Sequence, residues 1–254
     1  MEYRQWHEED KVTFHNESTV YFSECSRNGT LGLEKLLKLT SDLAVKDFAL
    51  RGMSAKTLLE NHYAILVSSV AFRFHQLPVE KQNITFSTWE EKSQPLQFLR
   101  QYEINDTDSG KPLISGYSTW LLVDPEARRI LPIKKFTMRP EVNYQKGHDC
   151  MEPGKISIPE NTELWDTRKI RRSEIDSNGH TNNSRYGAFI EDALPEALAE
   201  KQFTDFRLNY CKEAVLGDTL KIFGAVDEEG KKLTVLGKKE NGETSFEAEL
   251  YWKD

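Results

Sequence analysis

Apolar residues recur with helical spacing at two places in the chain, and strand-like stretches follow each place. After Asn28 and Gly29, one face of a long helix would carry a stripe of apolar residues. The members of this stripe are Leu33, Leu36, Leu37, Ala44 and Phe48. Strand-like stretches follow at 63–75, 84–89, 97–105 and 113–124. The spacing predicts a helix and then an antiparallel meander in the first half.

The same order recurs after Asn178 and Gly179. A second helical stripe consists of Tyr186, Phe189, Ile190, Ala193 and Leu194. Strand-like stretches follow at 205–211, 219–226, 231–239 and 243–252, and shorter ones precede the two helices at 20–23 and 169–175. The segment "SRNGTLG" at 26–32 aligns with "DSNGHTN" at 176–182. The chain is therefore predicted to be an internal duplication.

Each repeat is predicted to be one long helix lying across an antiparallel sheet, which is an α+β arrangement. Two such units can pair edge to edge and so cover sheet edges that would otherwise be exposed. We interpret the chain as a tandem, or double, hotdog fold. The predicted domains are an N-terminal hotdog domain at 1–124, a Pro-rich linker at 125–164 and a C-terminal hotdog domain at 165–254. Five of the nine prolines lie from Pro125 to Pro159, which is typical of an extended connection.

Charge and hydropathy argue against two classes of protein. A formal net charge of −7 does not suit a nucleic-acid-binding protein, whose surface must be basic. The longest apolar run, at 63–72, has about half the length that a membrane-spanning helix needs. The first residues, "MEYRQWHEED", lack the apolar stretch of a signal peptide. We therefore expect a cytoplasmic protein with no nucleic-acid partner and no membrane span.

Three cysteines, Cys25, Cys150 and Cys211, are widely spaced and include no CxxC pair. An odd number at such spacing indicates neither a disulfide framework nor a zinc site. No cofactor and no metal ion are expected.

The two repeats differ in the residues that precede their helices. Asn-Gly occurs in both, but Ser26 and Thr30 in the first repeat stand where the second has Asp176 and His180. Asn-Gly by itself is explained by a turn into a helix, with Asp176 or Asn178 as a cap. That explanation does not account for Asp, Asn and His together in one repeat only. The second repeat is therefore the candidate for acid–base chemistry.

A carboxylate, Glu213, ends the first strand after the second helix. Alone, a glutamate at a strand end is most often a solvated surface residue. The corresponding point of the first half is near Pro78, which can serve neither as acid nor as base. Glu213 is therefore a candidate partner for His180, with the solvated surface residue as the alternative.

The segment "DSNGHTNNSRYGAFIE" at 176–191 resembles the signature of acyl-acyl carrier protein (acyl-ACP) thioesterases, double-hotdog enzymes of plants and bacteria. In that family an Asp-x-Asn-x-His stretch opens the helix of the second domain. A glutamate then follows at the end of a later strand, which is "LNYCKEA" at 208–214 here. The similarity extends over nearly the whole chain. It implies the catalytic set Asp176, Asn178, His180 and Glu213.

The resemblance also implies an activity: hydrolysis of the fatty acyl-ACP thioester, which releases free fatty acid and ends chain elongation. A thiol has a pKa of about 8.5 and leaves easily, so catalysis can act on the water and the oxyanion. His180 and Glu213 would assist the water as a base pair, and Asp176 would fix the loop or the histidine tautomer. Asn178 and backbone N–H groups at the helix start would stabilise the oxyanion. Which of His180 and Glu213 takes the proton stays open.

One position departs from the family pattern. Plant members have a cysteine after the glutamate, and here that position is Ala214. Cys211 lies two residues before Glu213, and we expect it to be a small buried residue and not a nucleophile.

The resemblance places the acyl pocket in the first domain, which lacks the catalytic groups. Met53, Phe72, Phe74 and Trp120 are candidates to line this pocket, with an ordinary place in the core as the alternative for each.

The carrier protein of this family is acidic, so basic clusters are candidate docking sites. These clusters are Arg128–Arg129, Lys134–Lys135 and the segment 168–172. Two other functions remain: an acyl-CoA thioesterase, and a hotdog protein that binds acyl ligands without catalysis. A homodimer is also left open.

Overall fold

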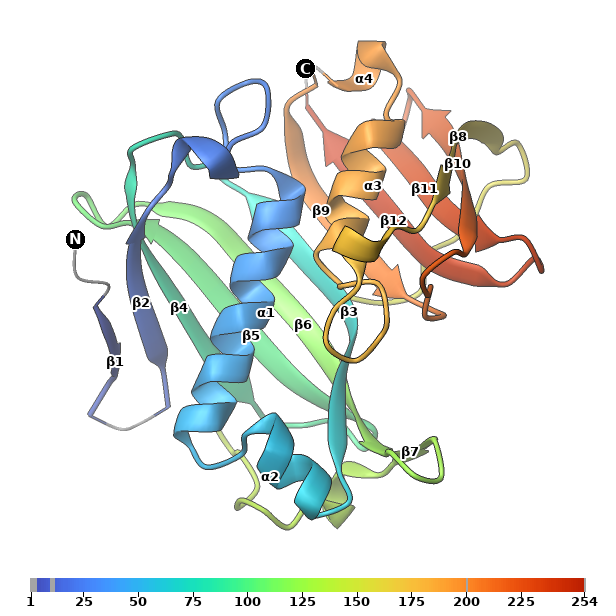
Figure 1. Ribbon diagram of the computed structural model, residues 1–254. Coiled ribbons are helices and arrows are strands. Elements are labelled where there is room, and N and C mark those ends of the chain that lie inside the picture. Colours follow the sequence, from blue (N-terminus) through green and yellow to red (C-terminus); the bar gives the residue numbers. More distant parts are fainter. Residues whose placement is uncertain (1–3, 10–11, 200, 254) are drawn as a thin grey trace.

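The computed structural model of the protein describes residues 4–9, 12–199 and 201–253. In the first half, a long helix and a short helix accompany the strands of one half-sheet (Figure 1). The elements are β1 Gln5–His7, β2 Phe14–Thr19, η1 Phe22–Glu24, α1 Leu33–Leu50, α2 Ala55–Glu60, β3 Ala64–Phe74, β4 Asn83–Glu91, β5 Gln97–Asp106, β6 Pro112–Asp124, β7 Arg129–Leu131 and η2 Ile133–Lys135.

The second half repeats the arrangement with fewer elements in its described part. They are β8 Glu163–Lys169, η3 Arg172–Glu174, α3 Arg185–Ala193, α4 Glu196–Ala199, β9 Phe203–Tyr210, β10 Thr219–Asp227, β11 Lys232–Lys239 and β12 Thr244–Trp252. The predicted meander strands of both halves are confirmed, to within two residues at each end.

All these strands belong to one antiparallel sheet in the order β1-β2-β4-β5-β6-β3-β9-β12-β11-β10-β8, with β7 paired to β6. The two halves are joined by β3 and β9, where Ser69 pairs with Asn209 and Phe72 with Phe206. The rings of this Phe72–Phe206 pair are stacked with centroids 6.4 Å apart. Edge-to-edge pairing of two helix-on-sheet units, as predicted, thus forms one continuous core.

Helices α1 and α3 lie on the same face of the sheet (Figure 1). The two helices pack closely at Gly187, where no side chain would fit, because a Cβ there would lie 2.6 Å from the backbone N of Glu34.

The connection after η2 crosses the opposite face, where Asn209 Nδ2 donates to the carbonyl oxygen of Gly154 at 2.9 Å. Within the predicted linker, β7 and η2 pack with the first half, and the domain boundaries at 124 and 164 stay a prediction.

The segments before the two helices differ from the predicted short strands at 20–23 and 169–175. The strands end at Thr19 and Lys169, and a 3₁₀ turn follows each of them. Glu24 accepts a hydrogen bond from Tyr21 N at 2.9 Å, and Glu174 accepts one from Arg171 N at 2.7 Å. These side chains satisfy backbone donors that a strand partner would otherwise satisfy, so the turns replace the strands.

The second helix is shorter than predicted. Helix α3 has 9 residues, whereas α1 has 18. Leu194 adopts an extended conformation, with φ −62° and ψ 131°, because the next residue is Pro195. No helix in the described residues is long and apolar enough to cross a bilayer.

A cluster of charged side chains is buried between α1 and the sheet. Asp47 on α1 accepts from Arg100 Nη2 at 2.8 Å and from Arg51 Nη2 at 2.7 Å. Glu90 accepts from Arg51 at 2.7 Å and from Arg139 at 2.5 Å. Burial alone would raise the pKa of Asp47, but Arg100 and Arg51 hold that pKa below its ordinary value of 3.8. The cluster fixes the position of α1 on the sheet.

Replacing Asp47 with Asn should lower the free energy of unfolding by about 3–5 kcal/mol, because Arg100 would stay buried without a negative partner. Asp42→Asn, at an exposed position of the same helix, should cost less than about 0.5 kcal/mol. Urea unfolding at neutral pH measures both values. Since the folded pKa of Asp47 lies below 3.8, the wild-type advantage should persist above that pH and shrink only as the pH falls further. Equal stabilities of wild type and Asp47→Asn would contradict the assigned ion pairs.

Candidate active site

The loop at 176–180 is held in shape by its own aspartate. Asp176 N donates to His180 O at 2.9 Å, which closes the loop. The Asp176 carboxylate accepts from the backbone N of Asn178 at 2.8 Å and from that of His180 at 3.4 Å. Gly179 has φ +84°, a left-handed conformation that favours glycine. The bonds of Asp176 therefore support its expected role in fixing the loop.

His180 and Glu213 are brought together by the pairing of this loop with the β9–β10 connection. Thr181 donates to Ala214 O through its backbone N at 2.8 Å and its hydroxyl at 2.9 Å. His180 Nε2 then lies 3.2 Å from Glu213 Oε2, with the side chains 37% and 46% exposed. Glu213 follows the end of β9 at Tyr210 by three residues, so it lies in the connection and not on the strand as predicted. A substrate can reach both groups.

The first half contributes Arg128 to this site. Arg128 lies in the β6–β7 turn with φ +49°, and its Nη2 is 3.5 Å from Glu213 Oε2. Lys239 on β11 donates to the carbonyl oxygen of Glu213 at 3.2 Å. No pattern in the sequence places Arg128 beside Glu213, because the contact depends on how β3 and β9 pair. The candidate site is therefore shared by both halves.

The donors that were expected at the helix start are partly occupied. Helix α3 begins at Arg185, and the N–H of Ser184 donates to Asn182 Oδ1 at 2.9 Å. Over the described residues, the N–H of Asn183 and the side-chain amide of Asn178 have no hydrogen-bond partner in the protein. These two groups remain free to bind an oxygen atom of a ligand.

In the first half, the polar side chains of the matching loop hydrogen-bond to one another. Asn28 Oδ1 accepts from Ser26 Oγ at 2.6 Å and from Thr30 Oγ1 at 2.8 Å. Leu31 N donates to Pro78 O at 2.8 Å, just as Thr181 N donates to Ala214 O. The residue that matches Glu213 is therefore Leu77, one position before the predicted Pro78. Neither residue can act as acid or base.

The amide that matches Asn183 N is also occupied in the first half. Leu33 N, at the start of α1, donates to Glu191 Oε1 of α3 at 2.9 Å. Burial raises the pKa of Glu191, and this hydrogen bond partly opposes that rise. Extending the alignment of the two repeats from 26–32 to Leu33 would have matched Leu33 with Asn183, but it would not have indicated Glu191.

Cys211 is exposed, so our expectation of a small buried residue is wrong. Its strand ends at Tyr210, and the chain turns away from the sheet there. Partial shielding of the thiol, together with the charge of Glu247, raises the pKa of Cys211 to about 11. A nucleophilic cysteine needs a lowered pKa, so Cys211 lacks the environment of a nucleophile.

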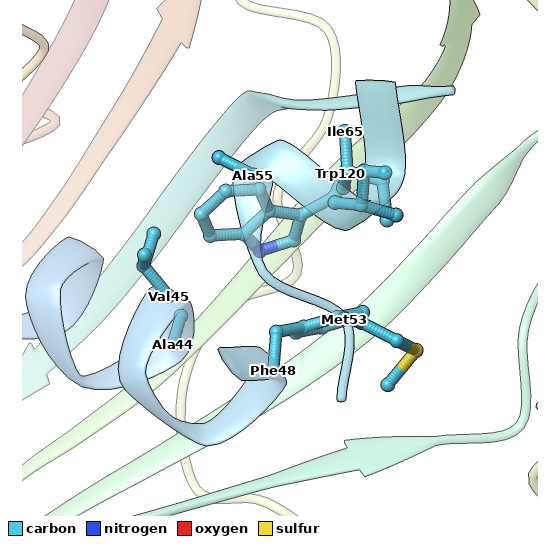
Figure 2. A pocket seen from close by; sticks show the side chains of 8 residues that line it. Ala44, Val45, Phe48, Met53, Ala55, Ile65 and Trp120 are labelled. Atoms are coloured by element: carbon cyan, nitrogen blue, oxygen red, sulfur yellow. The ribbon is translucent and has the colours of Figure 1, made fainter. Parts of the chain in front are cut away.

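An apolar cavity of about 100 Å³ lies in the first half between α1, α2 and the sheet (Figure 2). Of the four predicted pocket residues, Met53 and Trp120 line this cavity. Phe72 and Phe74 do not, because they belong to the main core beneath α1 and α3.

Two family domains match the chain. Residues 11–140 match the acyl-ACP thioesterase N-terminal domain, and residues 159–254 match the acyl-ACP thioesterase C-terminal domain. The chain belongs to the acyl-ACP thioesterase family.

Curated relatives are plant proteins at low identity. The chloroplastic acyl-[acyl-carrier-protein] hydrolase FATB2 of Cuphea viscosissima is 21% identical over 237 residues, which cover 88% of this chain and 57% of the relative. Oleoyl-acyl carrier protein thioesterase 2 of Arabidopsis thaliana is 20% identical over 269 residues, covering 94% of this chain and 72% of the relative. The chain thus spans a little over half the length of the Cuphea relative.

Solved structures share the fold. An acyl-ACP thioesterase from Bacteroides thetaiotaomicron VPI-5482 has a TM-score of 0.87 at 24% identity, covering 96% of this chain and 99% of the other. The 12:0-ACP thioesterase from Umbellularia californica has a TM-score of 0.79 at 14% identity, covering 95% and 96%. The predicted α+β double hotdog is confirmed.

The raised pKa of Cys211 predicts slow alkylation. At pH 8, iodoacetamide should modify Cys211 roughly a hundredfold more slowly than free cysteine, because little of the thiol is ionised. Peptide mapping by mass spectrometry over time measures the rate. Modification of Cys211 as fast as free cysteine would show that the thiol is activated.

Proposed function

We propose that the protein hydrolyses fatty acyl-ACP to free fatty acid and carrier thiol, and so ends chain elongation. The observation that carries this proposal is the His180–Glu213 pair, with 3.2 Å between Nε2 and Oε2. The matching positions of the first half are Thr30 and Leu77, which cannot move a proton at neutral pH. The first half has the same local backbone without an acid–base pair, so comparing the two halves points to the pair of the second half as the reactive group.

The reaction needs one proton transfer in each direction. The oxygen of a water molecule attacks the thioester carbonyl carbon while the His180–Glu213 pair takes one of its protons. The C–S bond then breaks, and the departing thiolate receives a proton from the protonated pair. The products are the fatty acid and the thiol, and no covalent enzyme intermediate forms. Which of the two side chains holds the proton first is left open.

The free amides supply donors for the oxyanion. The side-chain amide of Asn178 and the N–H of Asn183 have no hydrogen-bond partner within the described residues. Donors that are already in place stabilise the negative oxygen without further reorganisation. Asp176 acts indirectly, since its hydrogen bonds hold the loop that carries Asn178 and His180.

The acyl chain would bind in the apolar cavity of the first half. Its walls include Ala44 and Phe48 from α1, Ala55 from α2, and Ile65 and Trp120 from the sheet. Hydrocarbon binds here because the walls carry almost no polar group that would lose its water. The acyl pocket and the acid–base pair would thus come from different halves.

Acyl carrier protein is the proposed partner, and the site favours one of the three basic clusters for docking. Arg128 contacts Glu213, so Arg128–Arg129 lies at the mouth of the site. In the segment 168–172, Arg168 is engaged by Glu174 at 2.9 Å and by Asp192 at 3.0 Å. The first two residues of that segment belong to β8, the edge strand of the second half.

Two other functions remain as alternatives. An acyl-CoA thioesterase would use the same chemistry on a smaller carrier, and turnover of one acyl group on both carriers separates the two. A protein that only binds acyl ligands would release no thiol. A cytoplasmic location and a homodimer stay predictions.

Glu213→Gln should lower kcat on acyl-ACP by 10²–10⁴-fold, because the amide can neither accept the proton nor stabilise a charged imidazole. His180→Ala should lose a similar factor. Both side chains are over one third exposed, so thermal unfolding should change little. Glu240→Gln, an exposed glutamate in a neighbouring turn, is the control and should keep wild-type kcat. Wild-type turnover by a folded Glu213→Gln variant would leave Glu213 a solvated surface residue.

Arg129→Glu should raise KM for acyl-ACP roughly tenfold at low salt, since a like charge would repel an acidic carrier. The effect should fade as salt is added, and KM for the same acyl group on CoA should change little. Lys111→Glu, an exposed residue at the opposite end of β6 from the β6–β7 turn, is the control. An equal rise in KM for both variants would place the docking surface elsewhere.

A further inference from the structure

Three side chains with hydroxyl groups lie between α3 and the strands beneath it. Tyr186 belongs to α3, Tyr210 is the last residue of β9, and Ser245 lies on β12, the strand next to β9 (Figure 1). The rings of Tyr186 and Tyr210 are in edge contact, with centroids 5.6 Å apart. The reaction proposed above gives these three residues no role.

Tyr186 and Ser245 hold the residues on either side of Glu213. Ser245 Oγ donates to the carbonyl oxygen of Lys212 at 2.9 Å, so the hydrogen of this hydroxyl is used there. The Tyr186 hydroxyl lies 3.2 Å from Ser245 Oγ and must therefore donate to it. Burial raises the pKa of Tyr186, and hydrogen bonds to Ser245 and to the backbone of Ala214 partly oppose that rise. This chain of hydrogen bonds fixes the backbone that carries Glu213.

Tyr210 holds the other side of the site. Its hydroxyl donates to the carbonyl oxygen of Asn183 at 3.3 Å. Asn183 is the residue whose N–H is left without a hydrogen-bond partner among the described residues and is the candidate donor to the oxyanion. Burial raises the pKa of Tyr210, so its hydroxyl stays protonated at neutral pH and can donate. The bond therefore fixes the orientation of the residue that supplies this donor.

The two halves share the backbone around these residues, so their side chains can be compared position by position. In the second half, the two N–H groups that follow Tyr210 both donate to Ser245 O, at 2.9 and 3.1 Å. In the first half, the two N–H groups that follow Phe74 both donate to Leu113 O, again at 2.9 and 3.1 Å. Phe74 therefore matches Tyr210, and Leu113 matches Ser245.

The three hydroxyl groups have no counterpart in the first half. Tyr210 and Ser245 are matched by the apolar Phe74 and Leu113, and Tyr186 is matched by Leu36 when the alignment of the two loops is continued into the helices. The three first-half residues are buried in the main core. The same backbone thus packs well with apolar side chains at all three positions. The hydroxyl groups occur in the half that carries the acid–base pair, where they bond to its backbone.

We propose that Tyr210, Tyr186 and Ser245 are positioning residues for thioester hydrolysis. Tyr210 aims the N–H of Asn183 at the oxyanion, and the Tyr186–Ser245 pair holds Glu213 opposite the imidazole. Each acts through a backbone segment and not on the reacting atoms. Precise placement matters because a displacement of about 1 Å can cost up to roughly a hundredfold in rate. This inference rests on the proposed function.

Tyr210→Phe tests the first arm, since it removes one hydroxyl and leaves the side chain that the first half has at this position. With acyl-ACP, kcat should fall roughly tenfold while KM stays within about twofold, because the carrier and the acyl chain bind elsewhere. An acyl-pantetheine trifluoromethyl ketone, whose hydrated carbonyl carries a tetrahedral oxyanion, should bind roughly tenfold more weakly. The matching thioether without this carbonyl should bind as it does to the wild type.

Tyr251→Phe is the control for this arm. It removes a hydroxyl on β12 that donates to Glu249 at 3.1 Å, and it should leave kcat and the binding of both analogues unchanged. Wild-type kcat in Tyr210→Phe, or equal weakening of the ketone and the thioether, would overturn the role of Tyr210.

Ser245→Ala tests the second arm and is measured in two backgrounds. In the wild type, kcat should fall roughly tenfold, because Lys212 O and the Tyr186 hydroxyl each lose a partner and Glu213 is no longer held. In the Glu213→Gln background, the same change should alter kcat by less than about twofold, since a residue that acts through Glu213 has no base left to position. Tyr210→Phe should cost the same factor in both backgrounds. Equal losses from Ser245→Ala in both backgrounds would show that Ser245 serves only the fold.

Ser87→Ala is the control for the second arm. It removes a buried hydroxyl of the first half, 2.8 Å from His15 Nδ1, and should not change kcat in either background. Thermal midpoints of the single variants should fall by about 2–4 °C, as for one lost hydrogen bond. If Ser245→Ala does not fold, Tyr186→Phe replaces it in the same two backgrounds. A wild type that releases no thiol would contradict the proposed function, whereas an active wild type with unchanged variants would overturn this inference alone.

Discussion

The antiparallel pairing of β3 with β9 is the constraint on which the rest of the structure depends. It turns two half-sheets into one and lets α1 and α3 share a core on the same face. It also fixes where the β9–β10 connection lies, and so brings Glu213 within 3.5 Å of Arg128 from the first half. Without this register, Arg128 and Glu213 would not meet at the candidate site. The geometry of the candidate site thus depends on the backbone pairing between the two halves.

Duplication gave both halves the same backbone and different side chains. Each half has a 3₁₀ turn capped by a glutamate and a loop with a left-handed glycine, Gly29 or Gly179. In the first half, small hydroxyl groups satisfy Asn28, and Glu191 occupies the amide at the start of α1. In the second half, the matching groups are left open and an ionisable pair stands beside them. In the proposed function, this difference between the loops separates the half that binds the acyl chain from the half that carries the acid–base pair.

The sequence predicted what depends on neighbours along the chain. Periods of 3.6 and 2 residues located α1, α3 and the meander strands, since side-chain burial has the period of the element. The asymmetry between Thr30 and His180 indicated the candidate site, because the two loops are alike along the chain and differ in their ionisable side chains.

Contacts between distant segments were beyond prediction. The place of Arg128 beside Glu213, the cap from Glu191 and the ion cluster around Asp47 join residues 39 to 158 positions apart. A local rule accounts for the end of α3, because a residue that precedes a proline is disfavoured in the helical conformation. The match of Leu77 with Glu213 differed by one residue from the prediction, because loops carry no period that would fix an alignment.

The most direct measurement compares thiol release from dodecanoyl-ACP by the wild type and by a variant whose second loop carries the first-half residues. That variant is Asp176→Ser, His180→Thr and Glu213→Leu together. The account predicts that the rate falls at least 10²–10⁴-fold while thermal unfolding and hydrogen exchange along β3 and β9 stay close to wild type. Thiol release at an undiminished rate by the folded triple variant would contradict the account, because the reaction would then take place without the His180–Glu213 pair.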